Sequence, residues 1–236
     1  MGFSLAISML TTIPFFKIHD FFKGINGYAV MFYPVVGFIL GSILYGVNYL
    51  LDPYFASTHL HIILFALWVL LTGALHLDGL SDAIDALFVS KDRAIEVMKD
   101  PHVGAMGMTF TGVFLLLKAS ALWHLQALWA LPLILMLARF NVVLAIYFFP
   151  YIRENGMSTL AKKEFTSTQF FISTLLITVT ALLFTKGLIL LSIALISLLF
   201  FKFYFTKRFG GFSGDLYGFM IEGTELVLLH AVLLLC

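Results

Sequence analysis

The chain has 236 residues, of which 61% are hydrophobic and only 11% are charged, and its mean hydropathy is +1.02. Soluble domains are close to one quarter charged, so this chain lacks the polar surface that a soluble globule needs. Its net charge of +1 does not bear on nucleic-acid binding, but the sequence has no basic patch for it, and its one cysteine has no partner for an intrachain disulfide. The composition predicts an all-α, polytopic transmembrane helical bundle in a lipid bilayer.

The first predicted element is the apolar run 3–16, which Pro14 interrupts near its end. It is shorter than the roughly 20 residues that a spanning helix needs, and no Lys or Arg precedes it as in a cleaved signal. We therefore expect a short re-entrant or interfacial segment. About seven spans follow, with no linker between them, so residues 1–236 are taken as one catalytic membrane domain. The spans are residues 30–51, 60–77, 105–128, 130–150, 170–185, 187–205 and 216–236.

The distribution of basic residues predicts the orientation of these spans. Lys186 alone falls on one side, and Lys118 and Arg139 lie inside spans. Lys and Arg collect on the cytoplasmic side of membrane proteins, so we place the more basic side in the cytoplasm and the C-terminus outside. The residues on that basic side are Lys17, Lys23, Lys91, Arg93, Lys99, Arg153, Lys162, Lys163, Lys202, Lys207 and Arg208.

Three aspartates follow the second span. Asp78, Asp82 and Asp85 are spaced by four and three residues, so on a helix their carboxylates share one stripe. Like charges on one stripe repel, and a bound Mg²⁺, which prefers oxygen ligands, would turn repulsion into coordination. A solvated helix face is the simpler alternative. Asp82 and His76 are the candidate catalytic residues, although His76 lies off the stripe and packing or hydrogen bonding explains it equally well.

A second motif precedes the third span. Lys99 and Asp100 are candidate substrate-binding residues, and a surface ion pair is an equally good explanation. Gly104 and Gly107 share one helix face and would let a helix or a ligand approach closely.

A third motif begins in the segment before the last span and continues into the span. Gly210, Gly211 and Gly214 precede a helix N-terminus, where backbone N–H groups can bind an anion. Asp215, Glu222 and Glu225 follow on that helix as candidate substrate-binding residues. The alternative for Asp215 is a charge at the helix N-terminus, whereas a carboxylate inside a span, such as Glu222, marks a functional site or pairs with a buried cation.

Two cations lie inside predicted spans. Lys118 and Arg139 are too far from the span ends to reach water, so they should face a polar cavity or pair with Glu222 or Glu225. Arg153, just after the fourth span, can grip a phosphate or anchor the helix end. All three are counted as candidate substrate-binding residues.

These motifs resemble the cobalamin synthase family, whose members are adenosylcobinamide-GDP ribazoletransferases. The similarity is strongest from Thr72 to Asp85, and the similar segments follow the family's order over nearly the whole chain. The other matching parts are residues 11–14, 32–41, 96–107, 151–156 and 210–218, with Lys118, Arg139 and Glu225.

The resemblance implies a Mg²⁺-dependent, multi-pass enzyme of the bacterial inner membrane with its active site on the cytoplasmic side. A hydroxyl of α-ribazole, or of its 5′-phosphate, would attack the corrinoid-side phosphate of adenosylcobinamide-GDP. GMP would leave, and adenosylcobalamin or its 5′-phosphate would form. Asp78, Asp82 and Asp85 match the acidic motif of the family, whereas Lys99 stands where the family has Arg. A homo-oligomer is possible and stays open.

Two other interpretations fit parts of the pattern. A CDP-alcohol phosphotransferase also uses aspartates at the membrane edge, but Asp78-Gly79 is not followed here by the Ala-Arg of that motif. A secondary transporter would carry inverted repeats, and the sequence shows no convincing internal symmetry.

Overall fold

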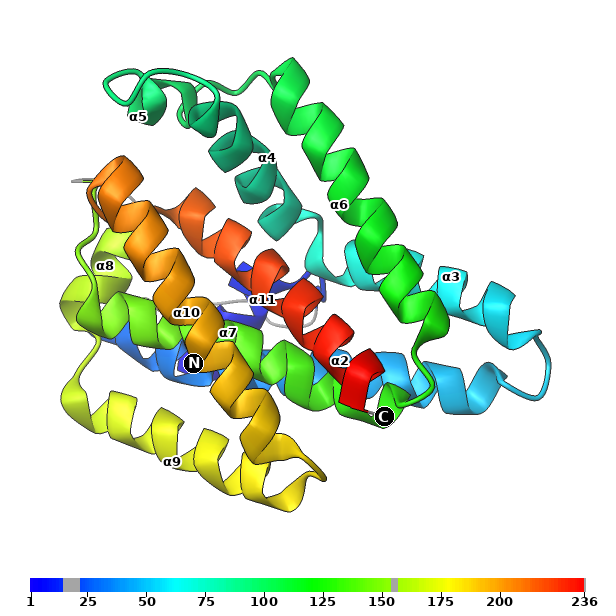
Figure 1. Cartoon of the computed structure of the whole chain (residues 1–236). Coiled ribbons are helices and arrows are strands. Elements are labelled where there is room, and N and C mark those ends of the chain that lie inside the picture. Colours follow the sequence, from blue (N-terminus) through cyan, green and yellow to red (C-terminus); the bar gives the residue numbers. More distant parts are fainter. Residues whose placement is uncertain (15–21, 154–156, 236) are drawn as a thin grey trace.

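The computed structural model describes residues 1–14, 22–153 and 157–235, and it is a bundle of helices (Figure 1). The described residues form no β-strand, only an isolated bridge between Tyr151 and Phe212. The helices are α1 (Gly2–Leu10), α2 (Ile25–Leu51), α3 (Ser57–Thr72), α4 (Leu75–Leu87), α5 (Ala94–Val97), α6 (Ala105–His124), the 3₁₀ turn η1 (Leu128–Ala130), α7 (Leu131–Phe148), α8 (Met157–Glu164), α9 (Ser167–Leu183), α10 (Gly187–Phe209) and α11 (Gly214–Leu235).

The N-terminal segment forms α1, a helix of nine residues that is too short to cross a bilayer, in agreement with the sequence prediction. It packs against α2, where a Cβ on Gly2 would lie 2.4 Å from Cβ of Tyr28. The rings of Phe3 and Phe32 meet edge to face at 5.6 Å. Residues 15 and 16 of the predicted segment, like Lys17, lie outside the described residues.

Among the described residues, five helical segments are long and apolar enough to span a membrane: α2, α6, η1 with α7, α10 and α11. Two further pairs, α3 with α4 and α8 with α9, pass the same test together but bend by 83° and 98°. Counting each bent pair as one span gives the predicted seven.

The prediction of one continuous span over residues 60–77 is wrong. The helix ends at Thr72, and Gly73 and Ala74 follow with φ values of +59° and +56°. Left-handed backbone stops an α-helix, and it is unfavourable for Ala by about 1–2 kcal/mol. The acidic motif therefore lies on a separate helix, α4, which turns away from α3.

Helix α7 forms the centre of the bundle, where almost every residue is buried. It packs along α2 (Figure 1), and two glycines of α2 make this contact close. A Cβ on Gly37 would lie 2.3 Å from the carbonyl oxygen of Leu135, and one on Gly41 would lie 2.5 Å from that of Leu131. The Gly37 and Gly41 motif thus fixes the packing of two core helices.

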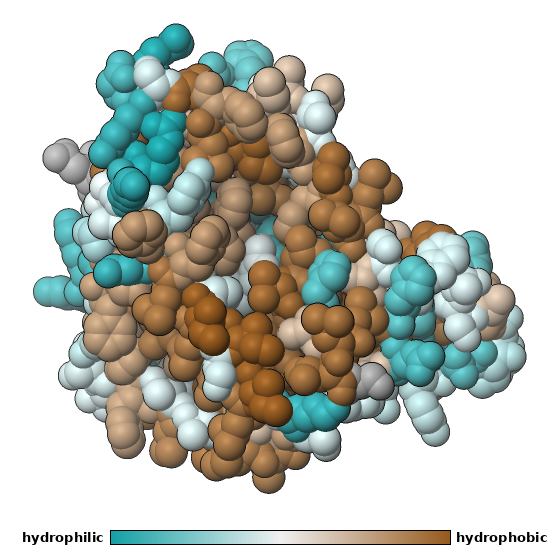
Figure 2. Space-filling view, viewed as in Figure 1, coloured by the Kyte–Doolittle hydropathy of each residue, from teal (hydrophilic) through white to brown (hydrophobic). Residues whose placement is uncertain are grey.

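The outer surface is apolar around the middle of the molecule. Figure 2 shows hydrophobic side chains across this face, with hydrophilic ones at its upper left and right. Leu116 and Leu183 are 73% and 79% exposed, as expected for residues that face lipid. Lys91 and Arg208 lie together at one end because Lys91 bonds to the carbonyl of Lys207 and Arg208 bonds to that of Ala86.

Candidate functional site

Two glycines bring α4 against the N-terminal half of α11. A Cβ on Gly79 would lie 2.9 Å from Cα of Asp215, and one on Gly218 would lie 3.0 Å from the carbonyl oxygen of His76. Any larger side chain would hold the two backbones apart. This contact places the first turn of α4, which carries Asp78, beside Asp215.

Asp82 lies at the centre of this acidic region. It is partly buried, and the carboxylates of Asp78, Asp215 and Asp85 are all close enough to repel its charge. Asp78 is exposed, and Arg153 provides an opposing positive charge. The arrangement favours binding of a cation or of a phosphate that carries one.

Asp85, unlike Asp78 and Asp82, binds the backbone at the start of another helix. One of its carboxylate oxygens accepts the backbone N–H of Gly104 at 2.7 Å, and the other accepts that of Gly107 at 2.8 Å. A Cβ on either glycine would lie 2.3 Å from a carboxylate oxygen of Asp85. Asp85 therefore caps the N-terminus of α6, where unpaired N–H groups and the helix dipole favour an anion.

Arg153 connects the acidic region to the loop before α6. Its Nη2 lies 2.5 Å from Oδ2 of Asp215 and donates to the carbonyl oxygen of Met98 at 3.0 Å. The hydroxyl of Ser213 donates to the same Asp215 oxygen at 3.3 Å and accepts the N–H of Leu216. Arg153 was a predicted site residue, and the structure brings it to Asp215.

A cavity of about 260 Å³ opens beside this ion pair. Asp78, Arg153 and Asp215 are its charged lining residues, and the rest of the wall is mostly apolar or aromatic. The other lining residues are Met9, Leu10, Tyr33, Leu75, His76, Gly79, Val142, Ile146, Tyr151, Ser158, Gly214, Tyr217, Gly218 and Ile221.

His76 belongs to the wall of this cavity. Its side chain is 3% exposed, and among the described residues neither ring nitrogen has a hydrogen-bond partner. Buried polar atoms normally have partners, so a ring without any is a place where a ligand or water would bind. The structure thus places His76 near the acidic region but not on the stripe of aspartates.

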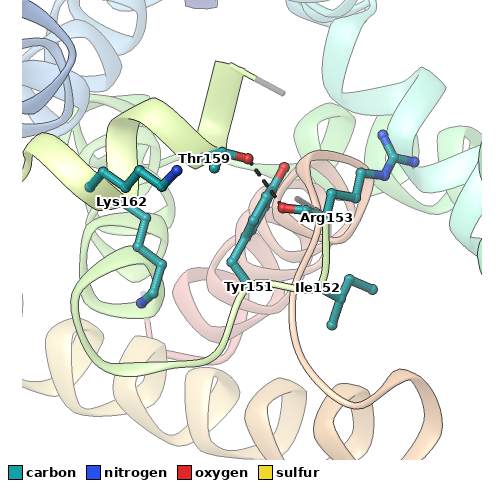
Figure 3. A pocket seen from close by; sticks show the side chains of 6 residues that line it. Tyr151, Ile152, Arg153, Thr159 and Lys162 are labelled. Atoms are coloured by element: carbon teal, nitrogen blue, oxygen red, sulfur yellow. Dashed lines mark hydrogen bonds between the residues drawn. The ribbon is translucent and has the colours of Figure 1, made fainter. Parts of the chain in front are cut away.

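A second pocket, of about 450 Å³, is also lined by Tyr151 and Arg153 (Figure 3). In Figure 3 the guanidinium of Arg153 points away from Lys162, while Thr159 bonds to the Arg153 carbonyl at 3.2 Å. The ammonium of Lys162 donates to the carbonyls of Ile146 and Phe149, at 2.7 and 2.6 Å. Lys162, which the sequence placed only on the basic side, therefore caps the C-terminus of α7.

The predicted pairing of the intramembrane charges is confirmed. Nζ of Lys118 lies 2.6 Å from Glu222 and 2.5 Å from Glu225, and Arg139 forms an ion pair with the second oxygen of Glu225. All four side chains are buried, and Lys118 also lies 4.1 Å from the ring centre of Trp68. None of the four lines the cavity.

Four other predicted substrate-binding residues lie away from the cavity. Lys99 and Asp100 are exposed, and the backbone N–H and ring of His102 lower the pKa of Asp100 by hydrogen bonding. Gly210 ends α10 with a φ of +88°, and Gly211 packs against the carbonyl of Pro150. Only Gly214 and Asp215 of that turn reach the cavity.

The donor set at the acidic region suits Mg²⁺, because it consists of carboxylate oxygens. Among the described residues no three acidic, His or Cys side chains converge closely enough to enclose an ion by themselves. Mg²⁺ usually binds one or two carboxylates and completes its shell with water and substrate phosphate, so any one or two of Asp78, Asp82 and Asp215 fit that use.

Sequence reasoning did not identify the cavity walls. Tyr33, Val142, Ile146 and Tyr217 occupy helical positions that look like ordinary core, and they become a site only where α2, α7 and α11 meet. Arg208 was read only as a basic-side residue, yet it donates to the last carbonyls of α4. No local signal in the sequence marks these long-range contacts.

The fold and site define a polytopic helical membrane protein with a carboxylate and arginine site at one end of its bundle. The chain belongs to the cobalamin-5-phosphate synthase family, whose family model matches residues 2–233.

Its relatives include three proteins named adenosylcobinamide-GDP ribazoletransferase. The protein of Desulforamulus reducens is 37% identical over 98% of this chain and 95% of its own length. The proteins of Acinetobacter baumannii (strain ACICU) and Thermosynechococcus vestitus are 38% and 37% identical, each over 86% of this chain and 85% of their own. No solved structure matches the chain.

Proposed function

We propose that this protein joins adenosylcobinamide-GDP to α-ribazole or its 5′-phosphate in the last steps of cobalamin biosynthesis. A ribazole hydroxyl attacks the corrinoid-side phosphorus, a new P–O bond forms, and the bond to the GMP phosphate breaks. GMP leaves with that bond's electrons, and the hydroxyl gives up its proton. The family membership supports the reaction, and the observation that carries its location is the close contact of α4 and α11 at Gly79, which brings the acidic stripe of α4 to the Arg153–Asp215 ion pair.

We further propose that one or two of the carboxylates of Asp78, Asp82 and Asp215 hold Mg²⁺ together with the diphosphate of the substrate. The ion would supply positive charge to the diphosphate oxygens and ease the departure of GMP. Asp85 is a weaker candidate ligand than the sequence suggested, because both of its oxygens already accept N–H groups of α6.

Arg153 has two roles in this proposal. Its guanidinium holds Asp215 in place and offers its remaining N–H groups to a phosphate, because a guanidinium can bind several oxygens at once. A carboxylate that does not bind the ion, Asp78 or Asp82, is within the region where the ribazole proton must be accepted.

We propose that this end of the bundle faces the cytoplasm of a bacterium, with the protein in the inner membrane. Arg153, Lys91, Lys207 and Arg208 are all at the end of the bundle that carries the acidic region, which agrees with the distribution of Lys and Arg.

The test is product formation by purified protein in detergent or liposomes. Adenosylcobinamide-GDP, α-ribazole and Mg²⁺ are supplied together, and GMP and the completed corrinoid are measured by chromatography. We expect both products in equal amounts, and none from CDP-diacylglycerol with a sugar or polyol acceptor. Folded protein that forms neither GMP nor a completed corrinoid would show that the proposal is wrong.

A further inference from the structure

We propose that the 260 Å³ cavity is the subsite for the aromatic base of ribazole, and that its walls decide which base the enzyme accepts. The inference rests on the proposed function and deepens it, because it assigns one part of one substrate to one part of the site. Its support is the division of the cavity into a charged rim and an apolar interior.

The charged residues of the cavity are Asp78, Arg153 and Asp215, which also belong to the acidic region. The α7 and α11 walls are formed by Val142, Ile146 and Ile221, whose side chains are only 2–3% exposed. A ligand that fits must therefore have a polar end for the rim and an apolar end for the interior.

The interior contains a few polar atoms that have no partner. Tyr217 is 5% exposed and its hydroxyl, like both ring nitrogens of His76, has no hydrogen-bond partner among the described residues. The ring of Tyr217 is held by stacking on Tyr151, at 6.1 Å between centres and 22° between planes. A buried polar group without a partner costs about 1–3 kcal/mol, which a ligand nitrogen could recover by accepting a hydrogen bond.

These features select a flat, largely apolar base with one free ring nitrogen, as in a benzimidazole. Guanine, the base of the other substrate, would bring several donors and acceptors into a wall that can pair only few of them, and each unpaired group is unfavourable. A corrin ring with its amide side chains is too large for a cavity of this volume. The benzimidazole of ribazole is the part of the two substrates that fits.

This placement orients the nucleophile. With the base between α7 and α11, the ribose extends to the rim, where Asp78 and Asp215 lie, and its hydroxyl meets the diphosphate there. The cavity would thus set the position of the attacking oxygen as well as the choice of base.

The test fills the cavity and measures each substrate separately. Val142→Phe and Ile146→Phe place a ring in the interior, and Leu144→Phe, on the same helix but outside the cavity, is the control. We expect the two cavity variants to raise KM for α-ribazole about tenfold or more while KM for adenosylcobinamide-GDP changes less than about threefold. Calorimetry with α-ribazole alone should show the same loss of binding without any turnover.

A second variant keeps the inference testable if the phenylalanine variants do not fold. Ile146→Ala enlarges the interior, so an α-riboside with a third fused ring should gain kcat/KM relative to α-ribazole. Native KM and binding of α-ribazole in both folded phenylalanine variants, or no change of base preference in Ile146→Ala, would overturn the subsite assignment. Native protein that forms no product would instead overturn the proposed function, whatever the variants bind.

Discussion

The ammonium group of Lys118 lies 2.5 Å from a carboxylate oxygen of Glu225, and both side chains are almost completely buried in the bundle. Glu222 is the second partner of Lys118, and Arg139 is the second partner of Glu225. Two positive and two negative groups therefore balance inside a part of the protein that excludes water. The four residues tie α6, α7 and α11 together.

Removing one member of this network should leave an uncompensated buried charge. We expect Lys118→Met to destabilise the protein by about 3–5 kcal/mol, because Glu222 then has no cation. Lys118→Met combined with Glu222→Gln restores the balance of charge and should recover more than half of the loss. Thermal unfolding in detergent measures both, with Lys202→Met at an exposed position of α10 as the control. A double variant no more stable than the single one would contradict this account.

Replacing Asp82 should lower turnover, whereas replacing Asp85 should lower stability, although the two residues are neighbours on one helix. Asp82→Asn should lower kcat roughly 10²–10³-fold, as expected when one charged group of a reacting site is lost. The folded protein should be as stable as the native one or more so, because three like-charged neighbours no longer repel that side chain. Assay of the purified variant together with its unfolding curve checks both statements, and unchanged turnover would contradict the role of Asp82.

Asp85→Asn should act mainly on stability. An amide has one acceptor oxygen, so one of the two N–H groups of α6 loses its partner, and the charge at the helix N-terminus is lost as well. We expect a loss of roughly 1.5–3 kcal/mol, the usual size of a hydrogen bond to a charged group. Hydrogen exchange should rise first in the opening turn of α6. Equal stability of Asp85→Asn and the native protein would show that the cap is unimportant.

The crossing of α4 and α11 should tolerate no side chain at Gly79. Gly79→Ala puts a methyl group 2.9 Å from the backbone of Asp215, and we expect a loss of about 1–3 kcal/mol together with lower activity. Gly112→Ala is the matched control, because it is also inside a helix but has nothing within 4 Å of the new Cβ. It should be neutral or stabilising by up to about 1 kcal/mol. Similar unfolding temperatures for the two variants would contradict the close contact.

The apolar helices and the pairing of the buried charges could be predicted from the sequence. The apolar helices follow from hydropathy, and the pairing of Lys118 and Arg139 with Glu222 and Glu225 follows because charges inside a bilayer need partners. The acidic motif on α4 was visible from its spacing alone.

The remaining features depend on contacts between distant residues. The bend between α3 and α4 has left-handed backbone at Gly73 and Ala74, a conformation that the intrinsic preference of Ala opposes, so the residue type at position 74 does not predict it. Asp85 was read as a ligand because its partners, Gly104 and Gly107, belong to another helix. The cavity exists only where six helices and a loop meet, and no stretch of sequence contains it.

Binding of Mg²⁺ and binding of the diphosphate substrate should each strengthen the other. No three side chains of the described residues enclose an ion, so the protein alone should bind Mg²⁺ weakly and the substrate phosphates should complete the shell. Activity should then disappear in chelator and return with Mg²⁺.

The Mg²⁺ concentration for half-maximal rate should fall as the concentration of adenosylcobinamide-GDP is raised, because linked binding is reciprocal. α-Ribazole, which brings no diphosphate, is the control and should leave that concentration unchanged. Calorimetric binding of Mg²⁺ to the free protein as tight as in the presence of the nucleotide would contradict a shared shell and would favour a site formed by the protein alone.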